Sequence, residues 1–164
     1  MDDEILDIVD ENDNIVNQAS KEEVYEKKYP HRIVHIFIFN DNGEMALQLR
    51  SKDKSYLPHH WSTAVGGHVQ SGESYEDAAL REFEEELGVK TPITLMFCDI
   101  YKDNRGYTKF LSTFRANYNG PFKVEPKEVE KVQFFKVNEI REMIKNNERF
   151  HPELLFLLKK YFNI

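Results

Sequence analysis

The strongest constraint on the fold of this chain is a helix near its middle with clear start and stop signals. Ser74 can cap the helix with its hydroxyl, Asp77 follows three residues later, and Gly88 is well placed to end it. At about 100° per residue, the apolar side chains share one side of this helix. They are Ala79, Leu80, Phe83 and Leu87. This side of the helix is expected to pack on the core.

Segments with strand character lie on both sides of the helix in the sequence. Residues 32–40 are β-branched and aromatic, an Asn-Gly turn follows, and residues 44–51 alternate apolar with small or polar side chains, which predicts a β-hairpin. Later strands are predicted at 93–101, 107–118 and 129–137, and helices at 138–147 and 152–162. Strands outnumber helices, which predicts a layered α/β architecture with a mixed sheet covered by helices.

Length and composition limit the classes of function. The 164 residues predict a single domain, 1–164, in which residues 1–30 form an N-terminal hairpin or arm. The formal net charge of −7 disfavours a nucleic acid polymer as the partner. A lone cysteine, no signal-peptide pattern and no apolar run near about 18 residues predict a cytoplasmic protein that does not associate with membranes.

The side of the helix next to its apolar face is crowded with carboxylates. Glu82, Glu85 and Glu86 fall within an arc of roughly 100°, where like charges repel one another. A divalent cation would reverse that repulsion, and carboxylate oxygens suit Mg²⁺ and Mn²⁺. Arg81 has a partner in Glu85, and Glu84 points roughly opposite, toward solvent. Taken alone, such a string is more often a solvated acidic helix surface than a metal site.

The spacing of the fixed positions in residues 66–89 favours a metal site over a solvated acidic surface. The fixed positions are, in order, Gly67, Glu73, Arg81, Glu82, Phe83, Glu85, Glu86, Gly88 and Val89. They reproduce the Nudix box, with phenylalanine at its first aliphatic position. A chance match at a given start has a probability of roughly one in 10⁸ on average composition. The chain therefore resembles the Nudix hydrolase superfamily, and the likeness extends from about Ile5 to Glu139.

The resemblance implies a fold, a reaction and a set of site residues. The fold is an α/β/α sandwich with a central mixed sheet, and the reaction is hydrolysis of a diphosphate linkage in a nucleoside diphosphate joined to another moiety, with Mg²⁺ or Mn²⁺ as cofactor. The implied metal ligands are the Gly67 carbonyl, Glu82, Glu85 and Glu86, with Glu73 in support. Two candidates remain for the general base: Glu82 in the box and Glu128 in a later loop.

Around the box, the chain looks like the branch of the superfamily that is close to isopentenyl diphosphate isomerase. By this resemblance Arg50 and Lys54 contact the diphosphate of a small-molecule substrate. His31 and His68 fall on two metal ligands of the isomerase.

The residues that the isomerase reaction needs are missing from this chain. Gly66 stands at the position of the catalytic cysteine, and Tyr107 and Lys109 stand at the acidic catalytic positions. We therefore expect a hydrolase of a nucleotide-type substrate, or of a prenyl-type substrate as second choice. The alternatives are the isomerase itself and a nucleotide-binding module without catalysis.

Several further residues carry structural expectations. His31 and His35 share one face of a strand and are expected to be buried and hydrogen-bonded rather than metal-bound. Cys98, inside an apolar strand pattern, is expected to be a buried small hydrophobe. Trp61 is expected to pack in the core. The N-terminal arm could pair with a second subunit, so a homodimer is compatible with the sequence.

Overall fold

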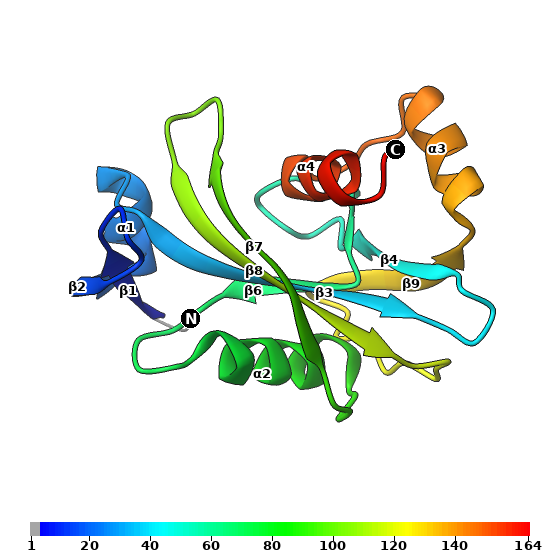
Figure 1. Ribbon diagram of the computed structural model, residues 1–164, viewed down its shortest axis with the longest axis horizontal. Helices are drawn as coiled ribbons and strands as arrows, with labels where there is room; N and C mark the ends of the chain where they lie inside the picture. The colour runs from blue at the N-terminus through cyan, green and yellow to red at the C-terminus, as the bar shows by residue number, and fades with distance from the viewer. Residues whose placement is uncertain (1–3) are drawn as a thin grey trace.

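A mixed sheet runs through the middle of the molecule, with helices on both of its faces (Figure 1). The computed structural model describes residues 4–164, so residues 1–3 of the predicted arm lie outside the described part. The strands of the sheet are β3 (His31–Phe39), β4 (Met45–Arg50), β5 (Trp61–Thr63), β6 (Val65–His68), β7 (Thr94–Lys102), β8 (Thr108–Asn117) and β9 (Val129–Phe135). The helices are α1 (Lys21–Lys27), α2 (Tyr75–Leu87), α3 (Val137–Lys145) and α4 (Pro152–Tyr161). The predicted α/β/α fold is confirmed.

The long strand β3 is the centre of the sheet and is buried along nearly its whole length. It runs parallel to β8 and antiparallel to β6, and β8 pairs antiparallel with the edge strand β7. A second group of strands is antiparallel in the order β5-β4-β9. β-branched and aromatic residues suit a strand such as β3 that is covered on both faces.

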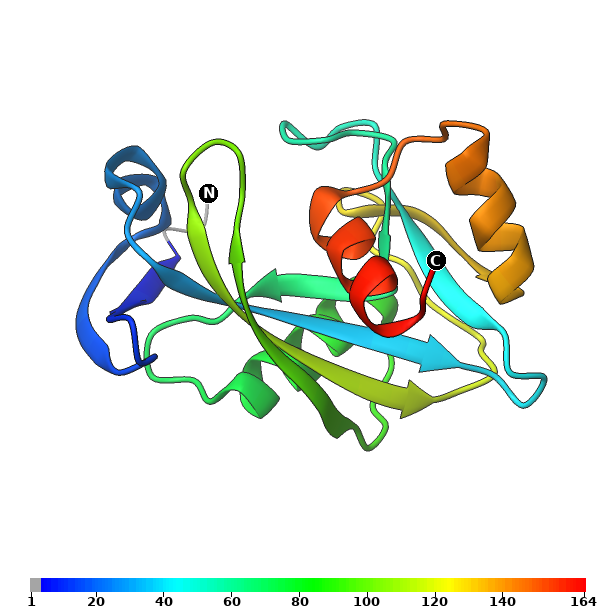
Figure 2. The same ribbon diagram turned by 45° about the horizontal axis from the view of Figure 1, so that its top comes forward.

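Helix α2 lies on one face of the sheet and α4 on the other (Figure 2), and an apolar layer joins the sheet to the helices on each face. Val34, Ile36 and Ile38 of β3 pack in the layer under α2. Ile33 and Phe37, which alternate with them, pack in the layer under α3 and α4. Because side chains of a strand alternate between faces, His31 and His35 also lie on the α4 side of the sheet.

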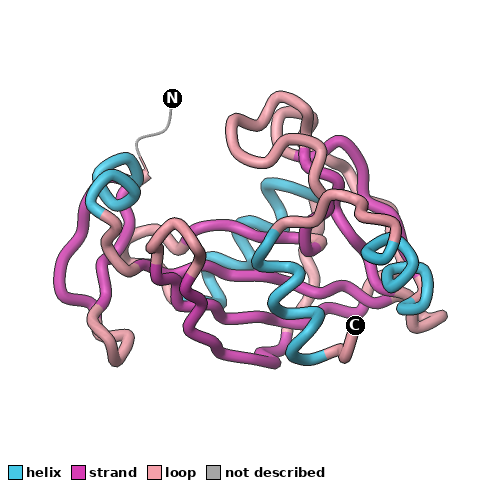
Figure 3. The backbone as a smooth tube through the Cα atoms, turned by 90° about the horizontal axis from the view of Figure 1, so that it is seen from above, coloured by secondary structure: helices cyan, strands magenta, loops and turns pink. Residues whose placement is uncertain are grey.

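The N-terminal segment forms the predicted hairpin. Strands β1 (Ile5–Val9) and β2 (Ile15–Ser20) pair antiparallel, and α1 follows them directly, a helix that the polar sequence had not suggested. Figure 3 shows the hairpin and α1 at one end of the sheet and α3 at the other. None of the helices within residues 4–164 has the length and apolar character needed to cross a bilayer.

The hairpin predicted around the Asn-Gly turn forms at its tip only. Phe39 and Met45 are the one registered pair between β3 and β4. Beyond this pair, β3 continues beside β6 and β8, whereas β4 continues beside β5 and β9. The strands therefore diverge, and the sheet opens between its two groups of strands.

The expected burial of Cys98 is wrong, because its side chain is exposed on the edge strand β7. The register of β7 against β8 shifts between Leu95 and Phe97, and the buried residue is the neighbouring Asp99. The Asp99 carboxylate accepts hydrogen bonds from the side chains of Lys160 and Tyr161. The apolar pattern of the segment predicted a strand correctly, but it did not indicate that one face of this strand is exposed to solvent. Trp61 is packed as expected, with 8% of its surface exposed.

Candidate active site

Helix α2 holds its acidic side chains on a firmly terminated frame. The Ser74 hydroxyl accepts from the Asp77 amide at 3.0 Å, and the Asp77 carboxylate accepts from the Ser74 amide in return. Gly88 ends the helix with a φ of 66°. Both predicted ends of the helix are thus confirmed, but the expected packing of Leu80 on the core is wrong, because Leu80 is 38% exposed and the buried apolar residues are Ala78, Ala79, Phe83 and Leu87. Because the carboxylates adjoin the packed face of α2, Glu82 and Glu86 keep only 9% and 6% of their surface exposed.

Without a positive charge beside them, the buried carboxylates of Glu82 and Glu86 repel each other and destabilise the folded state. Burial raises the pKa of Glu82 above its ordinary value. Burial, and then the charge of Glu82, raise the pKa of Glu86 well above its ordinary value. Glu86 Oε1 accepts one hydrogen bond, from Gln48 Nε2 at 2.8 Å. Such a pair gains stability from any positive charge placed beside it.

Strand β6 approaches Glu82 so closely at Gly67 that any side chain there would displace the carboxylate. A Cβ atom on Gly67 would lie 2.4 Å from both Cδ and Oε1 of Glu82. The missing side chain brings the main chain of Gly67 directly against the carboxylate. The box glycine and a box glutamate are therefore neighbours, as the predicted ligand set requires.

Arg81 organises the carboxylates around it. Its Nε and Nη2 atoms donate to the two oxygens of Glu73 at 2.7 and 2.9 Å, and Nη1 donates to Glu82 at 2.9 Å and to Glu85 at 3.2 Å. Nη2 also donates to the carbonyl of His68 at 3.0 Å. The expected Arg81–Glu85 contact is present, but the bidentate pair with Glu73 is the stronger one. The hydrogen bond to Glu73, ahead of the other partners, raises the pKa of the guanidinium.

The donor set on α2 and β6 fits a hard divalent cation. Two buried carboxylates and a closely approached peptide group offer oxygen atoms, which Mg²⁺ and Mn²⁺ prefer. The Glu85 carboxylate instead lies against Arg81 and is 59% exposed. Within residues 4–164, no three His, Cys, Asp or Glu side chains are already gathered into a group that could hold a metal ion. Glu85 would have to leave Arg81 to join the other two.

A cavity of about 640 Å³ opens beside these glutamates and brings together the predicted site residues except the supporting Glu73, which lies against Arg81. Besides Gly67 and the three box glutamates, these are Arg50, Lys54 and Glu128. The cavity is lined from β3 and β6 on one side and from β4 on the other, and so it occupies the place where the two groups of strands part.

The two predicted phosphate-binding cations already have partners in the protein. Arg50 donates to the carbonyls of Leu57 at 3.0 Å and Tyr56 at 2.7 Å, and burial lowers the pKa of its guanidinium. Lys54 forms an ion pair with Glu128, the candidate base from the later loop. These contacts hold both cations in the lining of the cavity.

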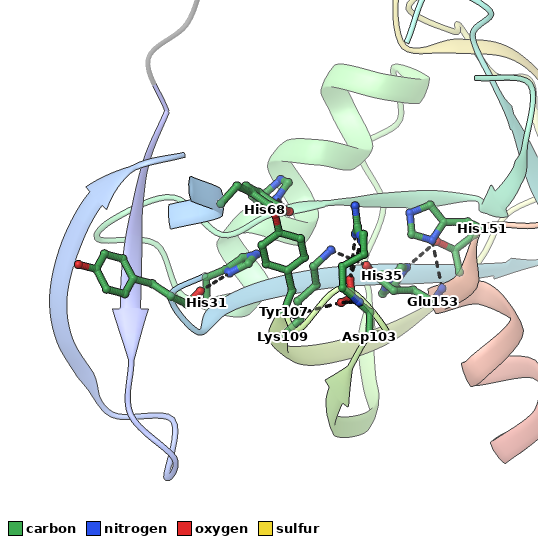
Figure 4. A network of polar contacts seen from close by, with 12 residues as sticks. His31, His35, His68, Asp103, Tyr107, Lys109, His151 and Glu153 are labelled. Carbon is green, nitrogen blue, oxygen red and sulfur yellow. Dashed lines mark hydrogen bonds and ion pairs between the residues drawn. The ribbon is translucent and has the colours of Figure 1, made fainter. Parts of the chain in front are cut away.

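The cavity has a second polar wall that the sequence did not predict. On the α4 side of the sheet, Lys109 Nζ donates to Glu153 Oε2 at 2.9 Å, and His35 Nε2 lies 2.9 Å from Glu153 Oε1 (Figure 4). His151 and Tyr25 line the cavity nearby. A glutamate at the start of the apolar segment 152–162 was the one available signal, because a buried acid beside a helix N-terminus needs a partner.

The two histidines at the isomerase ligand positions are packed with aromatic residues. The rings of His31 and His68 stack with their centroids 5.6 Å apart, and the Tyr25 hydroxyl lies 2.6 Å from His68 Nε2. Burial lowers the pKa of His31 to about 4 and holds that of His68 well below its ordinary value, so both rings are neutral near neutral pH. The predicted burial of His31 and His35 is confirmed.

Comparisons with known proteins agree with this geometry. The NUDIX domain family model matches residues 29–158. The Nudix hydrolase SCO1686 of Streptomyces coelicolor is 38% identical over 129 residues, which cover 77% of this chain and 71% of that protein. The crystal structure of DR0079 from Deinococcus radiodurans superimposes with a TM-score of 0.82 at 25% identity, and the match covers 96% of this chain and 98% of that one.

A partial match reaches the isomerase branch. Isopentenyl-diphosphate Delta-isomerase 2 of Photorhabdus laumondii is 36% identical over 99 residues, which cover 60% of this chain and 56% of that protein. This match supports the resemblance that was noted around the box. The family model and the hydrolase relative both cover more of the chain. The chain therefore belongs to the Nudix hydrolase family and is an enzyme of the pyrophosphohydrolase type, acting on phosphoric anhydride bonds.

Proposed function

We propose that this chain uses a divalent cation, Mg²⁺ or Mn²⁺, to hydrolyse the diphosphate bond of a small molecule linked to a nucleoside diphosphate. The observation that carries the proposal is the buried Glu82–Glu86 pair, which opens onto the same cavity as Arg50 and Lys54. A cavity lined by carboxylates next to cations suits a substrate whose anionic phosphates are bridged to the protein by a metal ion.

Four groups would hold the cation: the Gly67 carbonyl and the carboxylates of Glu82, Glu85 and Glu86. When bound, the cation neutralises charge on phosphoryl oxygens and lowers the pKa of a water molecule. Arg81 orients Glu82 through its Nη1 atom, and Glu85 would exchange its contact with the same atom for the cation. The fixed position of Arg81 on Glu73 limits how far the carboxylates can move.

Arg50 and Lys54 would bind phosphate oxygens, and two glutamates remain candidates for the base. Arg50 uses Nε and Nη2 on loop carbonyls, which leaves Nη1 for the substrate. Lys54 is paired with Glu128, so phosphate binding by Lys54 would release the Glu128 carboxylate. That exchange would free Glu128 to accept a proton from water when substrate is present. Glu82 would serve instead if it is not fully committed to the cation.

The polar cavity favours a nucleotide-type substrate over a prenyl diphosphate. Ile33 is the one aliphatic side chain among the described residues that line the cavity. An isoprenoid chain there would bury charged and polar groups without partners. The isomerase reaction is disfavoured for a separate reason, because Gly66 offers no group that could transfer a proton. A module without catalysis is disfavoured by the complete set of box carboxylates.

The decisive experiment is a substrate panel with Mg²⁺ or Mn²⁺. Nucleoside di- and triphosphates, sugar nucleotides, dinucleotides and prenyl diphosphates are assayed for release of phosphate or monophosphate. Glu85→Gln and Glu86→Gln should abolish any activity found. Glu84→Gln is the matched control on the same helix, because Glu84 is exposed and pairs with Lys90. Hydrolysis that survives in both Glu85→Gln and Glu86→Gln would place the site elsewhere.

The isomerase alternative is tested with isopentenyl diphosphate. We expect no dimethylallyl diphosphate after incubation of the purified protein with this compound and Mg²⁺. Formation of the dimethylallyl product at an enzymatic rate would show that the chain catalyses proton transfer without a cysteine at position 66, and hydrolysis would no longer be the assigned reaction.

We also propose that residues 1–164 act as one domain and that the N-terminal hairpin can join two subunits. Ile15 and Val16 of β2 are 54% and 60% exposed, which supports a contact at that strand. Light scattering coupled to gel filtration measures the mass. A monomer at all concentrations would contradict the subunit contact.

A further inference from the structure

The α4 side of the cavity holds an ion pair for which the proposed hydrolysis has no use. Lys109 comes from β8 and Glu153 from the first turn of α4, and their side chains are only 4% and 5% exposed. Both residues nevertheless line the cavity. A buried ion pair costs more in desolvation than it usually returns, so stability alone is a weak reason for its presence.

The pair keeps unused hydrogen-bonding capacity. Among residues 4–164, Lys109 Nζ donates at 2.9 Å to Glu153 and lies beside Tyr25, 5.5 Å from the centre of its ring and close to its hydroxyl. An ammonium carries three N–H donors. Glu153 Oε1 is engaged by His35 and Oε2 by Lys109, and each oxygen can accept a second hydrogen bond. Donor and acceptor capacity therefore remain side by side.

Both members of the pair stay ionised. Burial favours the neutral forms, but the charge and hydrogen bond of the Glu153 carboxylate act together with the neighbouring Tyr25 to outweigh it and raise the pKa of Lys109. For Glu153, burial is likewise outweighed by the hydrogen bond from His35 and by the charge of Lys109, which hold its pKa well below the ordinary value. The pair thus presents a cationic donor and an anionic acceptor with no net charge.

This arrangement selects hydroxyl groups over further charges. A third phosphate or a carboxylate at this position would approach Lys109 but would also meet the carboxylate of Glu153, so it would gain little. Arg105, another cation of the cavity lining, is likewise neutralised by Asp103 at 2.9 Å. A hydroxyl can accept from a lysine and donate to a carboxylate at once. Two adjacent hydroxyls match an adjacent donor and acceptor.

We propose that the Lys109–Glu153 pair is a specificity-determining element that recognises a vicinal diol on a sugar ring of the substrate. One hydroxyl accepts a hydrogen bond from Lys109 Nζ, and its neighbour donates one to Glu153. The inference rests on the proposed function, because it assigns the organic end of the substrate whose diphosphate lies at the box glutamates. The diol can belong to the ribose of the nucleoside or to a second sugar.

The test compares matched substrates that differ only in their hydroxyls. ADP-ribose and ADP-glucose are assayed beside counterparts that lack the 2′,3′-hydroxyls of the adenosine, and beside counterparts that lack two adjacent hydroxyls of the second sugar. We expect one of these deletions to lower kcat/KM by about tenfold to a hundredfold in the wild-type protein. The deletion that has this effect identifies which sugar contacts the pair.

Lys109→Met should remove the discrimination, because kcat/KM for the intact substrate should fall toward that for the deoxygenated one. In this variant the ratio of kcat/KM between the intact and the deoxygenated substrate should fall below about threefold. Glu153→Gln is the second variant, in case Lys109→Met fails to fold. Lys159→Met, which changes an exposed lysine on the same helix as Glu153, is the control and should keep the wild-type ratio. A purely structural pair would lower kcat/KM for both substrates equally and would overturn the inference.

The outcomes separate this inference from the proposed function. If the panel shows hydrolysis but neither deletion changes kcat/KM in the wild-type protein, diol recognition is wrong and the hydrolase assignment stands. If no compound is hydrolysed, the hydrolase assignment fails, and the same compounds are then compared by their effect on the thermal unfolding temperature. Equal shifts with and without the hydroxyls, or no shift with any compound, would also overturn diol recognition.

Discussion

Substitution of Gly67 by alanine tests the geometry of the box most directly. The added Cβ would lie 2.4 Å from Cδ of Glu82, whereas ordinary contacts begin near 3.4 Å, so the carboxylate must retreat by about 1.0 Å, the difference of the two values. No strain arises in the main chain, because Gly67 is not among the residues with positive φ. A displacement of about 1 Å in a catalytic group can lower the rate by about a hundredfold.

The assay measures kcat/KM and Mg²⁺ affinity of Gly67→Ala with the best substrate of the panel. We expect a loss of about a hundredfold in kcat/KM, weaker Mg²⁺ binding and a cooperative unfolding transition that is retained. Gly66→Ala is the matched neighbour, because its Cβ would meet His35 Nδ1 and Thr63 Oγ1 at 3.4 Å, on the other face of the strand. It should lose far less activity and no Mg²⁺ affinity. Activity of Gly67→Ala within threefold of wild type would refute the close packing of strand and carboxylate as a requirement.

Three further predictions follow from the same structure. Arg81→Lys cannot keep the bidentate bond to Glu73, so it should lose about 1–3 kcal/mol of unfolding free energy in urea, along with most of the activity. Burial lowers the pKa of His151 to about 4. As the pH falls from about 6.5 to 4, the unfolded chain therefore takes up the proton before the folded state does, and the folded state should lose up to about 3 kcal/mol of unfolding free energy. His151→Asn, which retains a capping side chain, should remove the His151 contribution to that acid-side decline in urea unfolding measured across this pH range, while the contributions of the buried His31 and His68 remain. Cys98 should react with a thiol reagent in the native protein nearly as fast as in urea, whereas strong native protection would contradict its exposure.

The parts of the fold that depend on local signals were predictable from the sequence. Ser74 and Gly88 fix the ends of α2 through their own side-chain and main-chain chemistry, so the helix was placed correctly without any tertiary information. The Asn-Gly turn was also predicted correctly, because it too depends on residues that are adjacent in the sequence. The divergence of β3 and β4 beyond that turn was not, because it depends on which distant strands each one pairs with.

The residues of the candidate site were likewise predictable only where they are close together in the sequence. The box residues share a helix and a fixed spacing, so sequence alone grouped Glu82, Glu85 and Glu86. Lys109 and Glu153 are 44 positions apart and belong to segments that read as an ordinary strand and an ordinary apolar helix. Only the docking of α4 on the sheet brings them together, and the one local signal, an acid at the start of an apolar helix, does not identify its partner. For Cys98 the local prediction itself was wrong, because an apolar strand pattern does not distinguish a buried face of a strand from an exposed one.

The delivery of His151 and Glu153 by helix α4 has a consequence for the timing of synthesis. A nascent chain that has emerged from the ribosome as far as Val89 already carries the whole Nudix box, yet it lacks Lys109 and Glu128 as well as the residues that α4 supplies to the cavity. Because a domain folds as a unit, the acidic helix is exposed without its cavity until the segments that follow it have been synthesised. The metal-binding carboxylates and the opposite side of the cavity would therefore come together only after the last helix has left the ribosome.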